Sequence, residues 1–149
     1  MIKNFIISII REARADDSRT PLVPSQVSNL LNKYSNLRII VQSSKKRCFK
    51  DEDYLKAGAE ITDDLSNADI IFGVKEVDIS KIIENKTYLF FSHTFKIKKV
   101  DQQNTQDVAI VYKRELLREV LKKNITLIDY ENIRDISGDG YRYLGFGRF

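Results

Sequence analysis

The chain has 149 residues, 42% of them hydrophobic and 31% charged, which supports one domain with a real core and excludes general disorder. No apolar run approaches the roughly 20 residues of a membrane span, and three arginines follow the first apolar block where a signal peptide would have a small-residue cleavage site, so we expect a cytoplasmic protein without a membrane partner. The single cysteine and single histidine exclude a disulfide framework and a Cys/His zinc site, and the net charge of +4 favours anionic partners only mildly.

Short apolar runs rich in β-branched residues recur along the chain. Their hydrophobicity is continuous and does not alternate, which is typical of strands buried on both faces of a parallel sheet. In chain order the predicted strands are Phe5–Ile10, Leu37–Val41, Asp69–Val74, Thr87–Phe91 and Ile125–Ile128.

The stretches between these runs carry helix signals. Apolar residues recur at helical spacing, a proline or an acid stands where a first turn prefers it, and a glycine follows the second helix at its C′ position. In chain order the predicted helices are Pro24–Tyr34, Asp51–Ala57, one beginning at Thr62-Asp63-Asp64, and Thr105–Lys123.

Alternation of strands and helices predicts the fold class. It indicates an α/β domain with three layers, in which helices cover both faces of an open, mostly parallel sheet. The end of the chain departs from this pattern, because Ser137–Gly140 is a turn signal between Ile133–Ile136 and Tyr141–Leu144. We therefore expect one domain over residues 1–149 with a small C-terminal hairpin.

Candidate functional residues follow from the strand ends, since ligands of open α/β sheets bind beyond the carboxyl ends of the strands. Lysine and histidine at such an edge can transfer protons, and arginine offers a planar fork for a substrate carboxylate. The candidates that directly follow predicted strands, or lie in the loop after the first one, are Arg19, Lys75, Glu76, His93 and Glu131.

Spacing alone leaves structural roles open for all of these residues. His93 also fits a structural loop residue, Lys75 and Glu76 fit a solvated pair, and Arg19 fits a surface charge. The basic runs Lys45–Arg47 and Lys96–Lys99 are interpreted as solvated loops, so no nucleic-acid partner is expected. Cys48 lies among cations but lacks the second histidine or cysteine that a nucleophilic site needs.

Several nucleotide and nucleophile motifs are absent from the sequence. No Gly-x-Gly-x-x-Gly follows a predicted strand, no phosphate-binding loop ends in Gly-Lys-Ser/Thr, and no Gly-x-Ser-x-Gly elbow occurs. We therefore expect this chain alone to bind no nicotinamide cofactor.

Six blocks of residues lie at or near the predicted strand ends and along nearly the whole chain: Arg19–Pro24, Tyr54–Ala59, Asp69–Val77, Lys86–Thr94, Leu127–Glu131 and Gly145–Phe149. In their residues and order they resemble a known family, the N-terminal domain shared by alanine dehydrogenase, proton-translocating transhydrogenase and saccharopine dehydrogenase. The residues after the last two predicted strands, and the end of the chain, resemble the branch of saccharopine dehydrogenase (lysine-forming) and lysine–oxoglutarate reductase.

The resemblance implies a reaction and roles for the candidate residues. In that branch the enzyme interconverts saccharopine with lysine and 2-oxoglutarate, using NAD or NADP. Lys75 and His93 would be the acid–base pair, and Arg19 would hold a substrate carboxylate. Glu76 and Glu131 would tune the charge of the cleft. A nucleotide-binding domain, in cis or in trans, would be the partner of this substrate-side domain.

Two other functions remain open from the sequence. One is a solitary module that binds an amino acid or a 2-oxo acid without turnover. The other is a fragment of an alanine dehydrogenase-like enzyme. In either case the 149 residues alone are expected to be inactive, and the apolar side chains of the last nine residues are expected to promote association.

Overall fold

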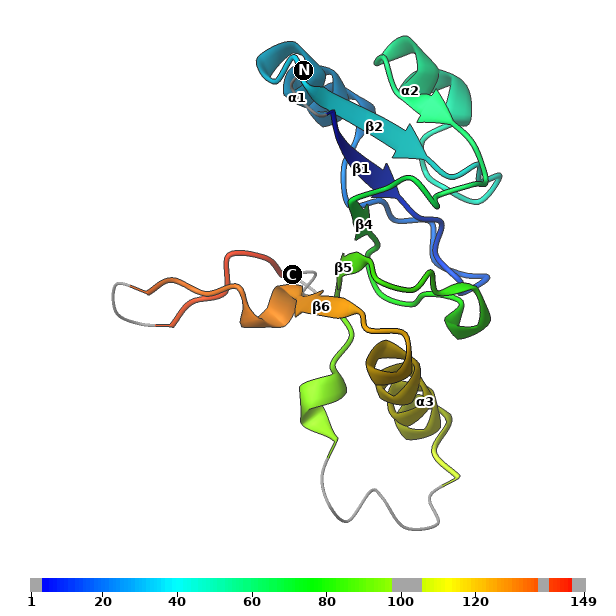
Figure 1. Cartoon of the computed structure of the whole chain (residues 1–149), viewed down its shortest axis with the longest axis vertical. Helices are drawn as coiled ribbons and strands as arrows, with labels where there is room; N and C mark the ends of the chain where they lie inside the picture. Colours follow the sequence, from blue (N-terminus) through cyan, green and yellow to red (C-terminus); the bar gives the residue numbers. More distant parts are fainter. Residues whose placement is uncertain (1–3, 98–105, 137–139, 146–149) are drawn as a thin grey trace.

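The computed structural model describes residues 4–97, 106–136 and 140–145 (Figure 1). Its centre is one sheet of six parallel strands in the order β3-β2-β1-β4-β5-β6. The strands are β1 (Phe5–Ile9), β2 (Leu37–Val41), β3 (Glu60–Ile61), β4 (Ile70–Phe72), β5 (Thr87–Phe90) and β6 (Thr126–Asp129).

Helices cover opposite faces of the two halves of this sheet. One face packs against α1 (Pro24–Lys33) and α2 (Asp51–Lys56), through buried Val27 and Tyr54. The other face packs against α3 (Val108–Lys122), through buried Leu116 and Val120. Figure 1 shows α1 and α2 beside β1 and β2, and α3 at the opposite end near β6. Three layers result, as predicted.

The alternation of side chains along β1 explains the two apolar cores. Ile7 and Ile9 pack in the core under α1 and α2, whereas Ile6 and Ile10 pack in the core under α3. Because β1 pairs with β2 on one side and with β4 on the other, strand order reverses between β1 and β4. This reversal is the topological switch point at which open α/β sheets bind ligands.

The sequence-based elements agree with the structure apart from one strand and one helix. All five predicted strands and the helices at Pro24, Asp51 and Val108 are present, although the predicted start Thr105 lies outside the described residues. Strand β3 was not predicted, because two residues carry no periodicity.

The helix predicted from Thr62 is wrong. Thr62 Oγ1 accepts a hydrogen bond from the Asp64 amide at 3.2 Å, and Asp64 Oδ1 accepts one from the Ser66 amide at 2.9 Å. Side chains of this kind stabilise turns as well as helix starts, and here the chain turns directly into β4.

The C-terminal hairpin is present as a short antiparallel contact. Arg134 and Arg142 form an isolated bridge, and the Asp135 amide donates to the Tyr141 carbonyl at 2.9 Å. The segment projects away from the sheet in Figure 1. The predicted turn at 137–139 and the apolar Phe146 and Phe149 lie outside the described residues, whereas the exposure expected at this end is confirmed for Tyr141, Tyr143 and Leu144.

Across the described segments, no helix combines the length and the apolar character needed to cross a membrane.

Candidate functional site

Four loops meet at the carboxyl edge of the sheet. Arg11 follows β1, Lys75 follows β4, His93 follows β5 and Glu131 follows β6. The loops are tied together by backbone hydrogen bonds, because the Phe91 amide donates to the Val74 carbonyl at 2.9 Å and the Ala13 amide donates to the Glu76 carbonyl at 3.0 Å. The edge is therefore built as one unit from strands β1, β4 and β5.

His93 and Glu131 form a close pair at this edge. His93 Nδ1 lies 2.6 Å from Glu131 Oε2, and the two side chains are 27% and 1% exposed. A carboxylate accepts at this distance, so His93 donates a hydrogen bond from Nδ1 to Glu131. The structure thus brings together two of the five predicted site residues.

The backbone of His93 is fixed by a second carboxylate. His93 has a left-handed backbone with φ of 53°, which is uncommon for a residue with a side chain. Its amide donates to Asp129 Oδ2 at 2.7 Å, and the Ser92 hydroxyl donates to the same oxygen at 2.7 Å. Asp129 therefore holds the turn after β5, while Glu131 holds the ring.

The Glu131 carboxylate, which has a single negative charge, also contacts two cations besides His93. Its Oε1 lies 2.7 Å from Lys96 Nζ and 2.7 Å from Arg142 Nη1. Burial opposes ionisation of this carboxyl group, but the hydrogen bonds from Lys96 and His93 prevail and lower its pKa. Glu131 is therefore an anion that contacts basic side chains from two segments, the turn after β5 and the C-terminal hairpin.

A second buried carboxylate, Glu12, lies at the switch point. Glu12 Oε1 accepts from the Val74 amide at 2.6 Å, and Oε2 accepts from the amides of Lys75 and Glu76 at 2.8 and 2.9 Å. Burial raises the pKa of Glu12 and outweighs the three amides, which act in the opposite direction. The loop that carries Lys75 is thus wrapped around this carboxylate.

Gly73 directly follows β4, beside the residues after β1. A Cβ added to Gly73 would lie 3.1 Å from Ile10 Cγ2, a tight contact, and 3.5 Å from Glu12 Oε1, an ordinary one. Glycine therefore leaves room for the Ile10 side chain at this point.

Arg19 is oriented by an aspartate of its own loop. Its Nε donates to Asp17 Oδ1 at 2.8 Å, and the Asp17 side chain is only 6% exposed while that of Arg19 is 41% exposed. The hydrogen bond from Arg19 lowers the pKa of Asp17. The guanidinium is therefore held from one side and remains accessible to solvent.

Lys75 and Glu76 are both partly buried and lie beside this arginine-rich loop. Arg14 Nη1 lies 3.9 Å from Glu76 Oε1, and Arg14 also binds Asp16 in two hydrogen bonds. The bond from Arg14 is the main cause that lowers the pKa of Asp16, and the charge of Lys75 adds to it. The structure therefore groups Lys75, Glu76 and the Arg14–Arg19 loop, while the convergence of Lys75 with His93 in one cleft stays a prediction.

Four residues of this edge were missed or misread in the sequence. Glu12 and Asp129 are buried acids at the ends of β1 and β6. Their places at strand ends were the one feature of the sequence from which they could have been named as site candidates. Lys96 was interpreted as part of a solvated loop, but it contacts Glu131. Arg142 was assigned no role, since its partner is brought near only by the fold.

The solvated interpretation of Lys45–Arg47 is wrong for Arg47. Its side chain is 2% exposed, its Nη2 donates to the Gln42 carbonyl at 2.8 Å, and its Nη1 lies 3.3 Å from Asp51 Oδ1. The guanidinium carbon lies 5.3 Å from the centre of the Tyr54 ring. Arg47 therefore connects the loop after β2 to α2.

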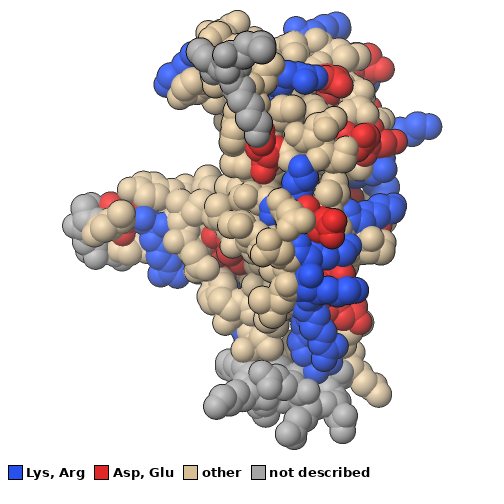
Figure 2. Space-filling model, viewed as in Figure 1, with Lys and Arg blue, Asp and Glu red and all other residues tan. Residues whose placement is uncertain are grey.

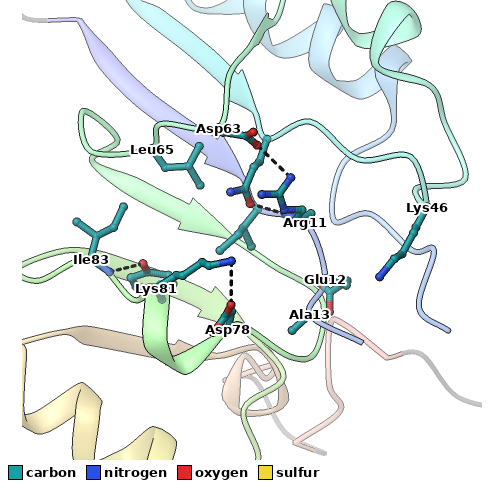
Figure 3. Close-up of a pocket in the computed structure, with 12 residues that line it drawn as sticks. Arg11, Glu12, Ala13, Lys46, Asp63, Leu65, Asp78, Lys81 and Ile83 are labelled. Atoms are coloured by element: carbon teal, nitrogen blue, oxygen red, sulfur yellow. Dashed lines mark hydrogen bonds and ion pairs between the residues drawn. The ribbon is translucent and has the colours of Figure 1, made fainter. Parts of the chain in front are cut away.

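A cavity of about 290 Å³ opens on the α3 side of the switch point (Figure 3). Figure 3 shows Arg11 directed at Asp63 and Lys81 directed at Asp78, with N–O distances of 3.0 and 3.2 Å. Glu12 lines this cavity, whereas Lys75 and His93 do not. Two of its acids and two of its bases therefore form ion pairs, and the cavity shares Arg11 and Glu12 with the carboxyl edge of the sheet.

Basic side chains also gather over α3, as Figure 2 shows at its lower right. Acidic residues interrupt them, and Glu119 lies 3.2 Å from Lys122 and 3.8 Å from Lys123. The described part of the chain holds no group of three His, Cys, Asp or Glu side chains suited to a metal ion.

Comparison with known proteins assigns the family. Residues 8–146 match the family described as alanine dehydrogenase/PNT, N-terminal domain. The chain belongs to this family. It is also 35% identical over 151 aligned positions to alpha-aminoadipic semialdehyde synthase of Arabidopsis thaliana, and 34% identical over 145 to the mitochondrial enzyme of that name from Bos taurus.

These alignments cover 98% and 97% of the chain but only 13% and 14% of the two relatives. The chain thus spans about one seventh of their length.

Solved structures of this family have the same fold. An L-alanine dehydrogenase superposes with a TM-score of 0.65 at 18% identity, over 89% of this chain and 34% of that one. A transhydrogenase from Sinorhizobium meliloti also gives 0.65, at 17% identity over 89% and 36% of the two chains. The six-stranded parallel sheet therefore has the same fold as these two structures, in agreement with the fold predicted from the sequence.

Proposed function

We propose that this domain is the substrate-side, acid–base half of a nicotinamide-dependent oxidoreductase that interconverts saccharopine with lysine and 2-oxoglutarate. The observation that carries the proposal is the His93–Glu131 pair at the carboxyl edge of the sheet, at 2.6 Å. The identity of 35% to an alpha-aminoadipic semialdehyde synthase supports this branch of the family over the alanine dehydrogenases, which share the fold at 18% identity.

The proposed chemistry uses the edge residues as proton carriers and charge partners. Cleavage of saccharopine passes through an imine that water attacks, and each step needs a group that gives or takes a proton. His93, with Nδ1 bound to Glu131, presents Nε2 for such a transfer. Lys75 would be the second carrier, and Arg19, half-exposed beside Asp17, would bind a substrate carboxylate.

The nicotinamide dinucleotide does not fit the switch point of this sheet. Dinucleotide-binding sheets of this strand order hold a pyrophosphate on backbone amides beside a glycine-rich turn after β1. Here Arg11 and Glu12 follow β1, and the Glu12 carboxylate already accepts the amides of Val74, Lys75 and Glu76. An anion in that place repels a pyrophosphate, so we assign to this chain the substrate and proton chemistry alone.

The test compares Lys75→Met and His93→Gln in the complete gene product, assayed for saccharopine oxidation with NAD or NADP. Each substitution should lower turnover by about 10²–10⁴-fold, because general acid–base groups contribute that much. The affinity for the nicotinamide cofactor should stay unchanged. Lys56→Met is the matched control, since Lys56 is an exposed lysine at the end of α2. Losses under tenfold for Lys75→Met would overturn its assignment as a proton carrier.

A further inference from the structure

The hydrogen bonds that the Glu12 carboxylate accepts come from main-chain amides of one loop. Only 8% of the residue is exposed. Its two oxygens accept three successive amides, from Val74 to Glu76, at 2.6–2.9 Å. Successive amides that converge on one anion form a nest, a feature more often filled by phosphate or another ligand.

The residues on either side of Glu12 also form main-chain hydrogen bonds with this loop and with the end of β4. The Glu76 carbonyl accepts the Ala13 amide at 3.0 Å, and the Ile10 amide donates to the Phe72 carbonyl at 2.9 Å. Hydrogen bonds therefore connect residues 10–13 to residues 72–76 along the turn that follows β4. Three of these bonds are accepted by the Glu12 carboxylate, and the other two join main-chain groups.

Lys75 lies in the middle of the three amides. Its backbone amide donates to Glu12 Oε2, so the carboxylate sets the direction in which the Lys75 side chain leaves the sheet. A lysine has a long flexible side chain, and fixing its backbone is the part of its position that the fold can control. Proton carriers must be held within a fraction of an ångström of the productive geometry.

We propose that Glu12 is a positioning residue, whose carboxylate fixes the Val74–Glu76 backbone and thereby places Lys75 in the substrate cleft. The role of Lys75 rests on the function proposed above, whereas the anchoring of the loop does not. Glu12 itself is bound to the main chain of the loop, and its proposed task is positioning, not proton transfer.

Two substitutions separate the charge of Glu12 from its length. Glu12→Gln keeps the size but replaces one accepting oxygen by an amide that donates, which faces at least one loop amide with another donor. Glu12→Asp keeps the negative charge, but its side chain is one methylene shorter, so the carboxylate lies farther from the loop amides. Val27→Ala is the control for loss of stability, because Val27 is a fully buried residue of α1 in the core on the α1–α2 face of the sheet.

Amide hydrogen exchange of the full 149-residue chain, followed by NMR, measures the anchoring. In Glu12→Gln the amides of Val74, Lys75 and Glu76 should exchange at least tenfold faster, beyond the change averaged over the β-strands, and Glu12→Asp should give a smaller increase. In Val27→Ala the increase should be uniform. The three amide proton resonances of the wild type should also follow one common titration at acidic pH, which Glu12→Gln abolishes. A uniform increase in Glu12→Gln, or three amides that titrate independently, would overturn the proposal.

Saccharopine binding to the same variants measures the consequence for the cleft. The dissociation constant should rise about tenfold in Glu12→Gln and stay unchanged in Val27→Ala compared at equal folded fraction. Equal binding by the wild type and Glu12→Gln, with altered exchange, would limit Glu12 to a structural role and refute the positioning of Lys75. If the wild type fails to bind saccharopine, the proposed function fails, while the exchange experiment still decides whether Glu12 anchors the loop.

Discussion

Two buried carboxylates hold the two sides of the candidate site by different means. Glu12, between β1 and β4, is bound by three backbone amides, and its pKa is raised because burial outweighs those dipoles. Glu131, after β6, is bound by His93, Lys96 and Arg142, and its pKa is lowered because charged partners outweigh burial. Amides fix the backbone of a loop at some electrostatic cost, whereas cations fix side chains and stabilise the anion.

This difference assigns separate tasks to the two sides of the edge. The Glu12 side orders a single loop, so its effect is confined to the segment that carries Lys75. The Glu131 side joins three segments, because Glu131 itself follows β6 and its partners come from η2 (Thr94–Lys96), whose N-cap is His93, and from the C-terminal hairpin. We expect perturbation of Glu131 to spread further than perturbation of Glu12.

The largest effect on stability is expected for Glu131→Gln. It leaves Lys96 and Arg142 close together beside a neutral side chain that is 1% exposed. Removing one partner of a buried charge pair costs about 3–5 kcal/mol, and the half-exposed state of both cations reduces this to about 2–3 kcal/mol here. Urea unfolding measures the loss. A change below about 0.5 kcal/mol would show that the cluster is fully solvated.

The stability lost in Glu12→Gln and the stability lost in Glu131→Gln should depend on pH with opposite signs. The folded-state pKa of Glu12 is raised, so its contribution to stability is complete below the unfolded pKa of about 4.3 and is lost as the pH rises through the folded value. The folded-state pKa of Glu131 is lowered, so its contribution is complete above about 4.3 and is lost as the pH falls through the folded value.

Unfolding free energies measured from pH 3 to pH 7 for the wild type, Glu12→Gln and Glu131→Gln test this contrast. The deficit of Glu131→Gln should grow toward neutral pH, and the deficit of Glu12→Gln should shrink. Parallel curves for the two variants would show that both carboxylates are stabilised alike. Glu52→Gln is the control, because Glu52 is an exposed acid in the first turn of α2.

The contrast also shows what the sequence could and could not predict. Strands such as Leu37–Val41 were predicted with their observed bounds because continuous apolar runs have one physical explanation in a parallel sheet. His93 and Glu131 were predicted as site residues from their places after β5 and β6, and they are in contact. Local pattern was sufficient for the strands, and strand topology made His93 and Glu131 candidates, whereas their roles as site residues came from the resemblance to the family.

Contacts between distant segments were beyond the sequence. Glu12 is 62–64 residues from the amides it accepts, and its carboxylate resembles any other loop acid until β1 and β4 are aligned. The contact of Arg142 with Glu131 could not be predicted for the same reason, since a basic residue near the end of the chain gave no sign of its partner. The helix predicted from Thr62–Asp64 was wrong for a different reason, because a local capping pattern fits a turn as well as a helix.

The smallest effect is expected for Arg142→Gln, which tests how far the Glu131 side extends. Arg142 is half-exposed, and Lys96 contacts the same oxygen of Glu131 at an equal distance of 2.7 Å, so the carboxylate keeps a cation after the substitution. Exposed ion pairs contribute about 0–1 kcal/mol, and the loss in urea unfolding should fall in this range. Local order should change more than stability, because the Arg142 side chain connects the hairpin to Glu131, while its backbone forms the bridge to Arg134.

The Asp135 and Tyr143 amides, which donate across the hairpin at 2.9 and 3.1 Å, should then exchange faster while the His93 amide, held by Asp129, stays protected. Loss of protection at His93 would mean that the hairpin helps to order the site itself. In that case Glu131 would transmit the order of the C-terminal hairpin to His93. The Glu131 side of the edge would then affect residues beyond its direct contacts, whereas the effect of Glu12 is confined to one loop.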